Sequence, residues 1–435
     1  MTGGAAKGFL IAAPQSGAGK TTVSLALLRA LRNAGKKVVS AKSGPDYIDP
    51  KFHEAASGRS CINLDAWAMS LDHIHGLAGT HAKADEYLVV EGAMGLFDGA
   101  ANGKGSGADL AACLGLPVIL VVDCAKQAQS VAALVSGFAS FRFDVRIAGV
   151  ILNRVGSDRH ERMLRAALEP LCLPVLGALP RLGELLLPER HLGLVQAEEH
   201  RGLEAFLEAA AKIFAEKIDL ELLSSLAMPL VASPSPCPSV LPPLGQRMAI
   251  ARDVAFAFAY PHLLDGWQAS GAELSFFSPI ADESPAFDAD AIYLPGGYPE
   301  LHAGKLANAS GFKTGMNTAA SNDTLIYGEC GGYMTLGEVL RDGDGTSHEM
   351  LGLLPLETSF ATRKRHLGYR VLEPHGRLPW SVPLSAHEFH YASICSEGPG
   401  EALFAAKDAE GNILPDMGLR NGTVLGSFAH VIDSA

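Results

Sequence analysis

Short apolar runs alternate with longer stretches of helical periodicity over the first 190 residues of the chain. Each run has four or five residues and ends at a polar or glycine-rich turn, a pattern typical of a buried strand. Strands that alternate with helices predict an α/β domain with a parallel sheet, which binds ligands at the carboxyl ends of its strands. The predicted strands are 9–13, 37–41, 87–90, 118–122 and 148–152.

A proline- and serine-rich stretch then interrupts this pattern. Residues 229–245 read PLVASPSPCPSVLPPLG, and proline continues neither a helix nor a central strand. We therefore predict a linker at 229–246 between an N-terminal domain, 1–228, and a C-terminal domain, 247–435. Further apolar runs that end in loops make the second domain α/β as well, and they are 248–252, 292–294 and 325–327.

The loop after the first predicted strand has the composition of a phosphate-binding loop, and a helical pattern that ends at Gly35 follows it. Glycines let backbone N–H groups surround phosphate oxygens, the lysine neutralises charge, and the first threonine can ligate Mg²⁺. Pro14 stands where the GxxxxGK[ST] pattern has its first glycine. A plain glycine turn before a helix is the simpler alternative. The sequence nevertheless favours nucleotide binding by Ser16, Gly17, Ala18, Gly19, Lys20, Thr21 and Thr22.

Acidic residues follow two of the other predicted strands. Asp46 and Asp49 lie in SGPDYIDP, and Glu91 and Asp98 lie in VEGAMGLFDG. Phosphoryl transfer needs carboxylates that hold Mg²⁺ against the triphosphate, and strand ends that face the phosphate loop can supply them. A single acidic loop residue is more often merely solvated, so the prediction depends on their shared placement. Asn153 ends the fifth strand, where it either contacts the adenine or caps a turn.

A cysteine between glycines follows the predicted strand 325–327, in the segment GECGG. This is the thiol form of a strand–turn–helix elbow, in which small neighbours permit a strained backbone that exposes the nucleophile. A helix N-terminus also lowers a thiol pKa. The segment LPGGYPEL supplies paired glycines at another strand end, so Gly297 and Gly331 are the predicted oxyanion donors for attack by Cys330. A lone cysteine in an apolar setting is more often a core residue.

A cysteine nucleophile needs a base, and the C-terminal domain offers three candidate histidines. His430 lies in GSFAHVI, whereas His387 and His390 lie in SAHEFHY. Spacing alone does not choose among them, and a histidine at each of these places is more often structural.

Composition narrows the class of protein. Hydrophobic residues make up 48% and charged residues 19% of 435 residues, with no run of 18 or more apolar residues and no charged-then-apolar leader at Met1. We therefore expect a soluble, cytoplasmic, globular protein. The net charge of −12, without a basic block, argues against a nucleic-acid partner. Seven cysteines form no CxxC pair, so we expect reduced thiols and no zinc site.

Nine segments together resemble the cobyrinic acid a,c-diamide synthase family, and the resemblance covers almost the entire chain. Two more segments, RKRHLGYRVLEP and LPERHLGLVQA, favour the aerobic-pathway branch, whose substrate is hydrogenobyrinic acid. GPDYIDP argues against the related cobyric acid synthases. The nine segments are SGAGKTTV, GPDYIDPKFH, NLDAWAM, EGAMGLFDG, LPGGYPEL, YGECGGYM, LGLLPLETSF, HEFHYA and GSFAHVI.

The resemblance implies a dethiobiotin-synthetase-like ATP domain followed by a class I glutamine amidotransferase domain. It implies that Cys330 is the glutaminase nucleophile and that His430 increases its nucleophilicity. The usual class I domain has His-x-Glu, but this chain has Ile432 at the third position. The group that orients His430 therefore stays unidentified in the sequence.

The resemblance implies that the substrate is a tetrapyrrole polycarboxylate, which is amidated on its a- and c-acetates. It also implies metal ligands and substrate contacts in the ATP domain. The co-substrates would be ATP and L-glutamine, with Mg²⁺ as cofactor and no membrane partner, and the family allows a homodimer. The implied metal ligands are Thr21, Asp46 and Glu91, and the implied substrate or intermediate contacts are Asp46, Tyr47, Asp49 and Asp98.

Two alternatives stay open. The same chemistry could act on cobyrinic acid or nickel-sirohydrochlorin. A different class is a regulatory or partitioning P-loop ATPase with an inactive amidotransferase-like module as a binding surface. Such ATPases often carry a second lysine near the start of the loop, where this chain has Gln15, and an intact GECGG elbow weighs against an inactive module.

Overall fold

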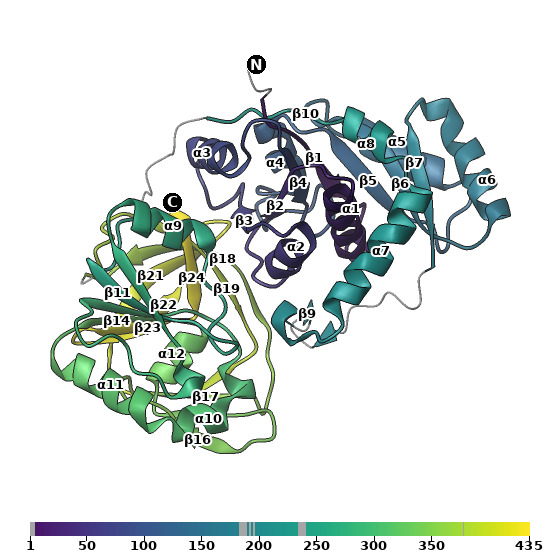
Figure 1. The fold of residues 1–435 in the computed structure, drawn as a ribbon. Coiled ribbons are helices and arrows are strands. Elements are labelled where there is room, and N and C mark those ends of the chain that lie inside the picture. The colour runs from purple at the N-terminus through teal and green to yellow at the C-terminus, as the bar shows by residue number, and fades with distance from the viewer. Residues whose placement is uncertain (1–4, 182–188, 191–192, 195, 234–240, 377) are drawn as a thin grey trace. The chain divides into compact units, whose positions relative to one another are not determined.

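The computed structural model divides the chain into two compact units, Met1–Cys237 and Pro238–Ala435. Part of the predicted linker, 234–240, and part of the segment LPERHLGLVQA lie outside the residues that the structure describes. Each unit is built around its own sheet (Figure 1). The described residues are 5–181, 189–190, 193–194, 196–233, 241–376 and 378–435.

The N-terminal sheet has eight strands, of which seven are parallel in the order β3-β2-β4-β1-β5-β6-β7, and β10 pairs antiparallel with β1. The predicted parallel α/β fold is confirmed, although β3 and β7 are not among the predicted strands. Their runs, CINL and VLGALP, are short or contain glycine and proline. The bounds are β1 Lys7–Ala12, β2 Val38–Ser43, β3 Cys61–Leu64, β4 Tyr87–Glu91, β5 Val118–Asp123, β6 Ile147–Val155, β7 Val175–Pro180 and β10 Met228–Pro229.

Helices cover this sheet, and α1 lies beside α7 (Figure 1). Arg29 of α1 is buried and donates to Glu204 at 2.8 Å and Glu208 at 2.7 Å, both on α7. These bonds join the helix that follows the phosphate loop to its neighbour. The bounds are α1 Lys20–Asn33, α2 Asp49–Ser57, α3 Leu71–His81, α4 Gly107–Leu114, α5 Val131–Ser140, α6 Asp158–Leu168, α7 Leu203–Lys217 and α8 Leu220–Ser225, with short helices η1 Glu169–Leu171 and η2 Ala197–Glu199 and the two-stranded ribbon β8 Glu189–Arg190 and β9 Gly193–Leu194.

The C-terminal unit contains a ten-stranded sheet in the order β12-β11-β13-β14-β23-β22-β21-β18-β19-β24. The first five strands run parallel, and the others pair antiparallel. Nothing in the sequence pattern predicts the antiparallel half, since strands such as ILPDMGLRN alternate irregularly and stay partly exposed. The bounds are β11 Arg247–Ala251, β12 Glu273–Phe277, β13 Ala291–Leu294, β14 Leu325–Glu329, β18 His366–Pro374, β19 Leu384–His390, β21 Glu401–Asp408, β22 Ile413–Asn421, β23 Val424–Ser427 and β24 Ala429–Ser434.

A four-stranded sheet in the order β16-β15-β17-β20 and several helices complete the C-terminal unit. Its core includes the stacked rings of Tyr293 and Tyr327, with centroids 6.0 Å apart. The bounds are β15 Val339–Arg341, β16 Ser347–Glu349, β17 Leu356–Ser359, β20 Ser393–Glu397, α9 Pro261–Ala269, α10 Ala303–Asn308, α11 Ser310–Ser321, α12 Gly331–Leu336, η3 Pro279–Ala281 and η4 Pro299–Leu301.

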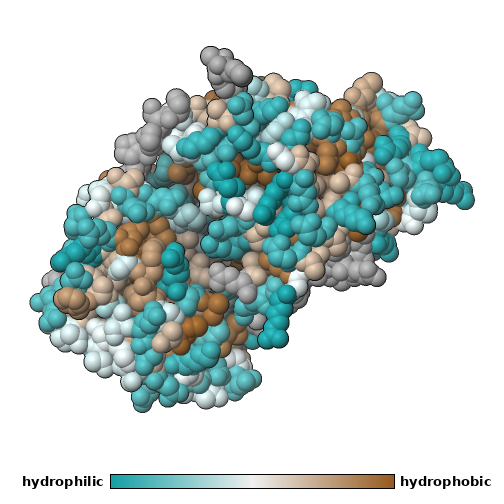
Figure 2. Space-filling view, viewed as in Figure 1, coloured by the Kyte–Doolittle hydropathy of each residue, from teal (hydrophilic) through white to brown (hydrophobic). Residues whose placement is uncertain are grey.

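Hydrophobic residues on the face drawn in Figure 2 lie in separate patches among hydrophilic ones. No helix in the described part of the chain is long and apolar enough to cross a membrane. All cysteines within the described ranges are free thiols, and Cys237 lies outside those ranges.

Candidate functional site

The predicted phosphate loop joins β1 to α1, and its backbone turns through the left-handed region at Gly17 (φ 76°) and Gly19 (φ 88°). Asn153, at the end of β6, donates to the Ala18 carbonyl at 2.8 Å. A Cβ atom on Gly19 would lie 2.5 Å from the Asn153 amide nitrogen, so the glycine is needed for this contact. The Asn153 side chain therefore braces the loop backbone.

A small cavity of about 80 Å³ lies beside this loop. Its polar lining residues are Thr22, Asn153 and Arg154, and Leu179 and Phe214 contribute apolar surface. A flat, largely apolar group with a few hydrogen-bonding atoms suits such a lining.

Oxygen atoms converge in front of the loop. The Thr21 hydroxyl lies 2.8 Å from Glu91 Oε1 and 3.2 Å from Asp49 Oδ2. Lys42 Nζ donates to the same two carboxylates, at 2.6 Å from Asp49 and 2.8 Å from Glu91. Glu91 Oε2 is 2.7 Å from His53 Nε2. Lys42 and Glu91 are register partners at the carboxyl ends of the adjacent parallel strands β2 and β4, which explains their close approach.

Neighbouring groups, which outweigh burial, determine the charges in this cluster. The Glu91 side chain is 0% exposed, which by itself raises its pKa, but Lys42 and His53 outweigh burial and hold the pKa well below its usual range. Burial also disfavours the charged form of His53, but hydrogen bonds to Cys61 and Glu91 raise its pKa to about 10. The carboxylate is therefore ionised between two cationic groups.

Asp46, Asp98 and Lys20 make hydrogen bonds with backbone groups. Asp46 Oδ1 accepts the backbone N–H groups of Ile48 and Asp49, and Oδ2 is 3.9 Å from Lys42 Nζ. Asp98 Oδ2 accepts from Gly95 N at 3.0 Å, and Lys20 Nζ donates to the Met94 carbonyl. Burial, then the charge of Asp49, raises the pKa of Asp46 to about 6.

Tyr47 lies in the turn between Asp46 and α2. Of the carboxylates predicted from the sequence, Asp49 and Glu91 are the ones that lie within hydrogen-bonding distance of Thr21.

Neither Lys42 nor His53 is among the residues predicted from the sequence. Lys42 looks like an ordinary strand residue in VVSAKS, although a lysine that follows apolar positions is a weak sign of a buried charge. His53 is four residues after Asp49, on one face of α2, and this spacing could have identified it.

Cys330 lies between β14 and α12 with φ 45° and ψ −99°, a backbone conformation that is strained for a non-glycine residue. A Cβ atom on Gly332 would collide with the Leu294 carbonyl, so the elbow requires a glycine there. Cys330 N donates to Ser427 O at 2.8 Å, and its sulfur is 4.0 Å from Phe389 O. The predicted strand–turn–helix geometry is present at this residue.

The expectation of a lowered thiol pKa is wrong for this geometry. Burial raises the pKa of Cys330, and the charge of Glu300 adds to that effect. Among the main influences on this thiol, the hydrogen bond from the Gly331 N–H is the one that lowers the pKa. The N-terminus of the six-residue helix α12 does not compensate for the removal of water, so the resting thiol is protonated.

His430 on β24 packs against the paired glycines. A Cβ atom on Gly296 would collide with the His430 ring, and one on Gly331 would lie 2.9 Å from Gly297 N. The elbow, the glycine pair and His430 are thus connected in one site. Burial, then the charge of His387, lowers the pKa of His430 to about 3.

The two other candidate histidines lie on β19. His387 is the register partner of His430, and burial lowers its pKa to about 4. His390 Nε2 is 2.9 Å from Glu388, its Nδ1 is 3.0 Å from Ala392 O, and its ring stacks on Phe428. The contacts of His390 are therefore those of a structural residue.

A ligand atom from each of His366, Glu388 and His390 lies within 4.8 Å of the others, a grouping that could hold a metal ion. Glu388 is already engaged, however, because Arg370 Nη2 is 2.7 Å and His390 Nε2 is 2.9 Å from its carboxylate.

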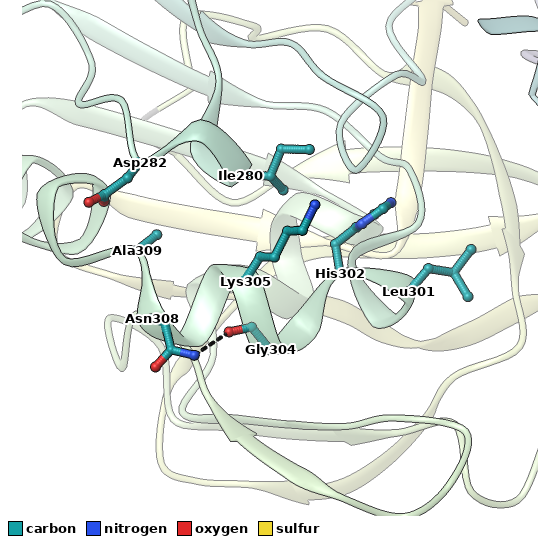
Figure 3. Close-up of a pocket in the computed structure, with 8 residues that line it drawn as sticks. All are labelled: Ile280, Asp282, Leu301, His302, Gly304, Lys305, Asn308 and Ala309. Carbon is teal, nitrogen blue, oxygen red and sulfur yellow. Dashed lines mark hydrogen bonds between the residues drawn. The ribbon is translucent and has the colours of Figure 1, made fainter. Parts of the chain in front are cut away.

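An open hollow of about 630 Å³ is lined in part by Leu301, the last residue of the GGYPEL segment. Figure 3 shows Lys305 and His302 extending toward the same side of it, while Asn308 donates to Gly304 O at 2.8 Å. Its lining contains none of the residues predicted for the glutaminase site.

Both units match known families. Residues 9–195 match the CobQ/CobB/MinD/ParA nucleotide binding domain, and residues 247–435 match the CobB/CobQ-like glutamine amidotransferase domain.

Three relatives that match nearly the whole chain are named hydrogenobyrinate a,c-diamide synthase. The protein of Brucella abortus is 61% identical and that of Rhizobium meliloti 58% identical, with 98% of this chain covered in both cases and 98% and 99% of the relatives. The protein of Mesorhizobium japonicum is 49% identical, with 99% of each chain covered.

Replacing Lys42 by methionine should destabilise the N-terminal unit, because Asp49 and Glu91 would lose their shared buried partner. Removal of one member of a buried ion pair costs about 3–5 kcal/mol, and calorimetric unfolding would record it as a lower Tm. The control is Lys51→Met, whose side chain is 50% exposed beside Glu54 and should change stability by about 0.5 kcal/mol or less. Equal effects of the two substitutions would contradict the buried-pair account.

Proposed function

Because this chain belongs to the hydrogenobyrinate a,c-diamide synthase family, we propose that it amidates the a- and c-acetate carboxylates of hydrogenobyrinic acid. It is a glutamine-hydrolysing carbon–nitrogen ligase, and ATP and L-glutamine are its co-substrates. One observation supports the proposal best. The chain contains both a cluster of carboxylate and hydroxyl oxygens beside a phosphate loop and a cysteine elbow beside a buried histidine.

A carboxylate is a poor electrophile, so the N-terminal unit has to activate it. ATP would transfer its γ-phosphoryl group to an acetate oxygen, giving an acyl phosphate and ADP. We assign nucleotide binding to the loop residues 16–22, with Lys20 on the phosphates and Asn153 bordering the cavity offered to the base. Tyr47, Asp49 and Asp98, together with Asp46, would contact the substrate or the acyl phosphate.

The residues present fit Mg²⁺, because hard cations take hydroxyl and carboxylate oxygens and Thr21 lies beside Glu91 and Asp49. Thr21, Glu91 and Asp46 would hold the ion, with Asp49 as an additional ligand. When bound, it would neutralise charge on the phosphate oxygens. Lys42 and His53 keep Glu91 ionised for this role.

The C-terminal unit would supply ammonia. The thiol proton of Cys330 passes to His430, the sulfur attacks the glutamine amide carbon, and the N–H groups of Gly297 and Gly331 stabilise the oxyanion. The carbon–nitrogen bond breaks as His430 returns its proton to the leaving group, and water then hydrolyses the thioester to glutamate. Ammonia displaces phosphate from the acyl phosphate, and two such cycles give the diamide.

We further propose that the enzyme works in the cytoplasm, where ATP and glutamine are available. Its partners would be small molecules and, if the chain dimerises, a second copy of itself, without nucleic acid or membrane.

The cysteine assignment is tested with two substitutions. Cys330→Ala should abolish glutamine-dependent amidation of hydrogenobyrinic acid and retain amidation with ammonium salts, because the acyl-phosphate chemistry needs no thiol. Lys20→Ala should abolish both activities, since both need bound ATP. Mass spectrometry of the product measures the amidation activity of each variant. Full glutamine use by Cys330→Ala would refute the thiol assignment.

The substrate assignment needs a direct comparison. Hydrogenobyrinic acid, cobyrinic acid and nickel-sirohydrochlorin should be incubated in parallel with ATP and glutamine, and kcat/KM determined for each. We expect kcat/KM for hydrogenobyrinic acid to exceed that for each other macrocycle by at least about 10-fold, a ratio that differences in binding can supply. A higher kcat/KM for either of the other macrocycles would contradict the assignment of hydrogenobyrinic acid as the substrate.

A further inference from the structure

His430 has no acidic residue two positions after it. The residue there is Ile432, whose carbonyl accepts a hydrogen bond from His262 at 2.8 Å. A carboxylate from another strand lies nearby instead. Glu329 Oε2 is 3.9 Å from His430 Nδ1, and both side chains are 2% exposed. Glu329 is also the residue that directly precedes Cys330.

Hydrogen bonds fix the Glu329 carboxylate in this position. Oε2 accepts from the Tyr293 hydroxyl at 2.7 Å, and Oε1 accepts from the Tyr327 hydroxyl at 3.2 Å. Oε1 also accepts from Val431 N at 3.0 Å, and Val431 is the neighbour of His430 in β24. The same side chain is therefore joined covalently to the nucleophile and by a hydrogen bond to the backbone beside the base.

Glu388 is a second carboxylate whose charge acts on His430, but its oxygens accept from different partners. Arg370 Nη2 and Nε lie 2.7 Å and 2.9 Å from Oε2, and His390 Nε2 lies 2.9 Å from Oε1. Among the described residues, the basic side chain within ion-pair distance of Glu329 is that of His430.

We propose that Glu329 is the positioning residue for His430 and takes the role that the third residue of His-x-Glu has in the usual class I domain. The inference rests on the proposed glutaminase function. With Glu329 on the Nδ1 side, neutral His430 carries its proton on Nδ1, and Nε2 is the basic nitrogen. When the thiol proton of Cys330 moves to Nε2, the carboxylate stabilises the imidazolium that forms.

The charges around His430 make this support necessary. His387 and His390 on β19 both lower its pKa, Glu388 opposes them, and burial dominates, so the imidazolium is disfavoured in the resting site. Burial also raises the pKa of Glu329 to about 7, so its carboxylate becomes charged as the pH rises through that value. Glutaminase activity should therefore rise with pH near 7 as Glu329 ionises.

Glu329→Gln tests the inference, because it keeps the size of the side chain and removes its charge. We expect kcat for glutamine hydrolysis to fall by about 10²-fold with little change in KM, and the rise in activity near pH 7 to disappear. Glu329→Asp retains the charge and should retain that rise at a reduced rate. A purely structural role would lower the rate without moving the pH profile, and an unchanged profile in Glu329→Gln would overturn the proposal.

Two controls accompany these variants. Glu86→Gln removes a buried carboxylate of the N-terminal unit, bound to Arg59 at 3.2 Å, and should leave the glutaminase profile unchanged. Ammonia-supported amidation in each variant reports whether the N-terminal unit is folded, and calorimetric unfolding reports whether the C-terminal unit, which contains Glu329, is folded. Wild-type chain without any glutaminase activity would refute the proposed function itself, whereas active wild type with an unaffected Glu329→Gln variant would refute only this inference.

If Glu329→Gln does not fold, the wild-type chain still provides a test. Nitrogen NMR of the ¹⁵N-histidine-labelled protein, with His430 assigned by difference from His430→Gln, identifies the tautomer of the neutral ring. Protonation on Nδ1 is expected. Protonation on Nε2 would contradict the proposal, because the ring would then present no proton to Glu329.

Discussion

Ionisable groups at both candidate sites are buried away from water, and this constraint determines the chemistry that each site can perform. A buried charge is costly unless an opposite charge or several hydrogen bonds accompany it. The N-terminal unit meets the constraint by pairing, since Glu91 lies between Lys42 and His53. The C-terminal unit meets the constraint by keeping Cys330 and His430 uncharged, because burial raises the pKa of Cys330 and lowers that of His430.

These two solutions suit two kinds of chemistry. A charged cluster that is already assembled beside the phosphate loop is ready for anionic oxygens and a divalent cation, and it needs no reorganisation when they arrive. A neutral thiol and a neutral imidazole become reactive only together, when a proton passes from one to the other. The support that Glu329 offers to the imidazolium would then decide how readily the thiolate forms.

Local sequence signals predicted the parts of the fold that local physics determines. The parallel strands of the N-terminal sheet follow from their continuous apolar runs, and the phosphate loop and the GECGG elbow follow from glycines that allow close backbone approach. The antiparallel half of the C-terminal sheet is different, because its partly exposed strands owe their pairing to distant neighbours. Strands β3 and β7 are missed because their runs are short or interrupted.

The same division applies to the sites. Cys330, Thr21 and Glu91 stand in segments with recognisable spacing, whereas Lys42 becomes significant only when β2 and β4 pair and place it beside Glu91. The sequence does not reveal the importance of Glu329, because it depends on β24, which is about a hundred residues away in the sequence and brings His430 and Val431 to it. Burial likewise reversed the expected shift of the Cys330 pKa, and burial is not visible in a motif.

The central claim is that ammonia made at Cys330 becomes the amide nitrogen of the product formed in the ATP-dependent reaction. The most direct measurement uses [amide-¹⁵N]glutamine with ATP and hydrogenobyrinic acid, in buffer containing unlabelled ammonium at low concentration, followed by mass spectrometry of the macrocycle. The account predicts a diamide with ¹⁵N in both amides, formed together with two glutamates and two ADP. Hydrolysis of glutamine without label in the macrocycle, or a product with unlabelled amides, would contradict it.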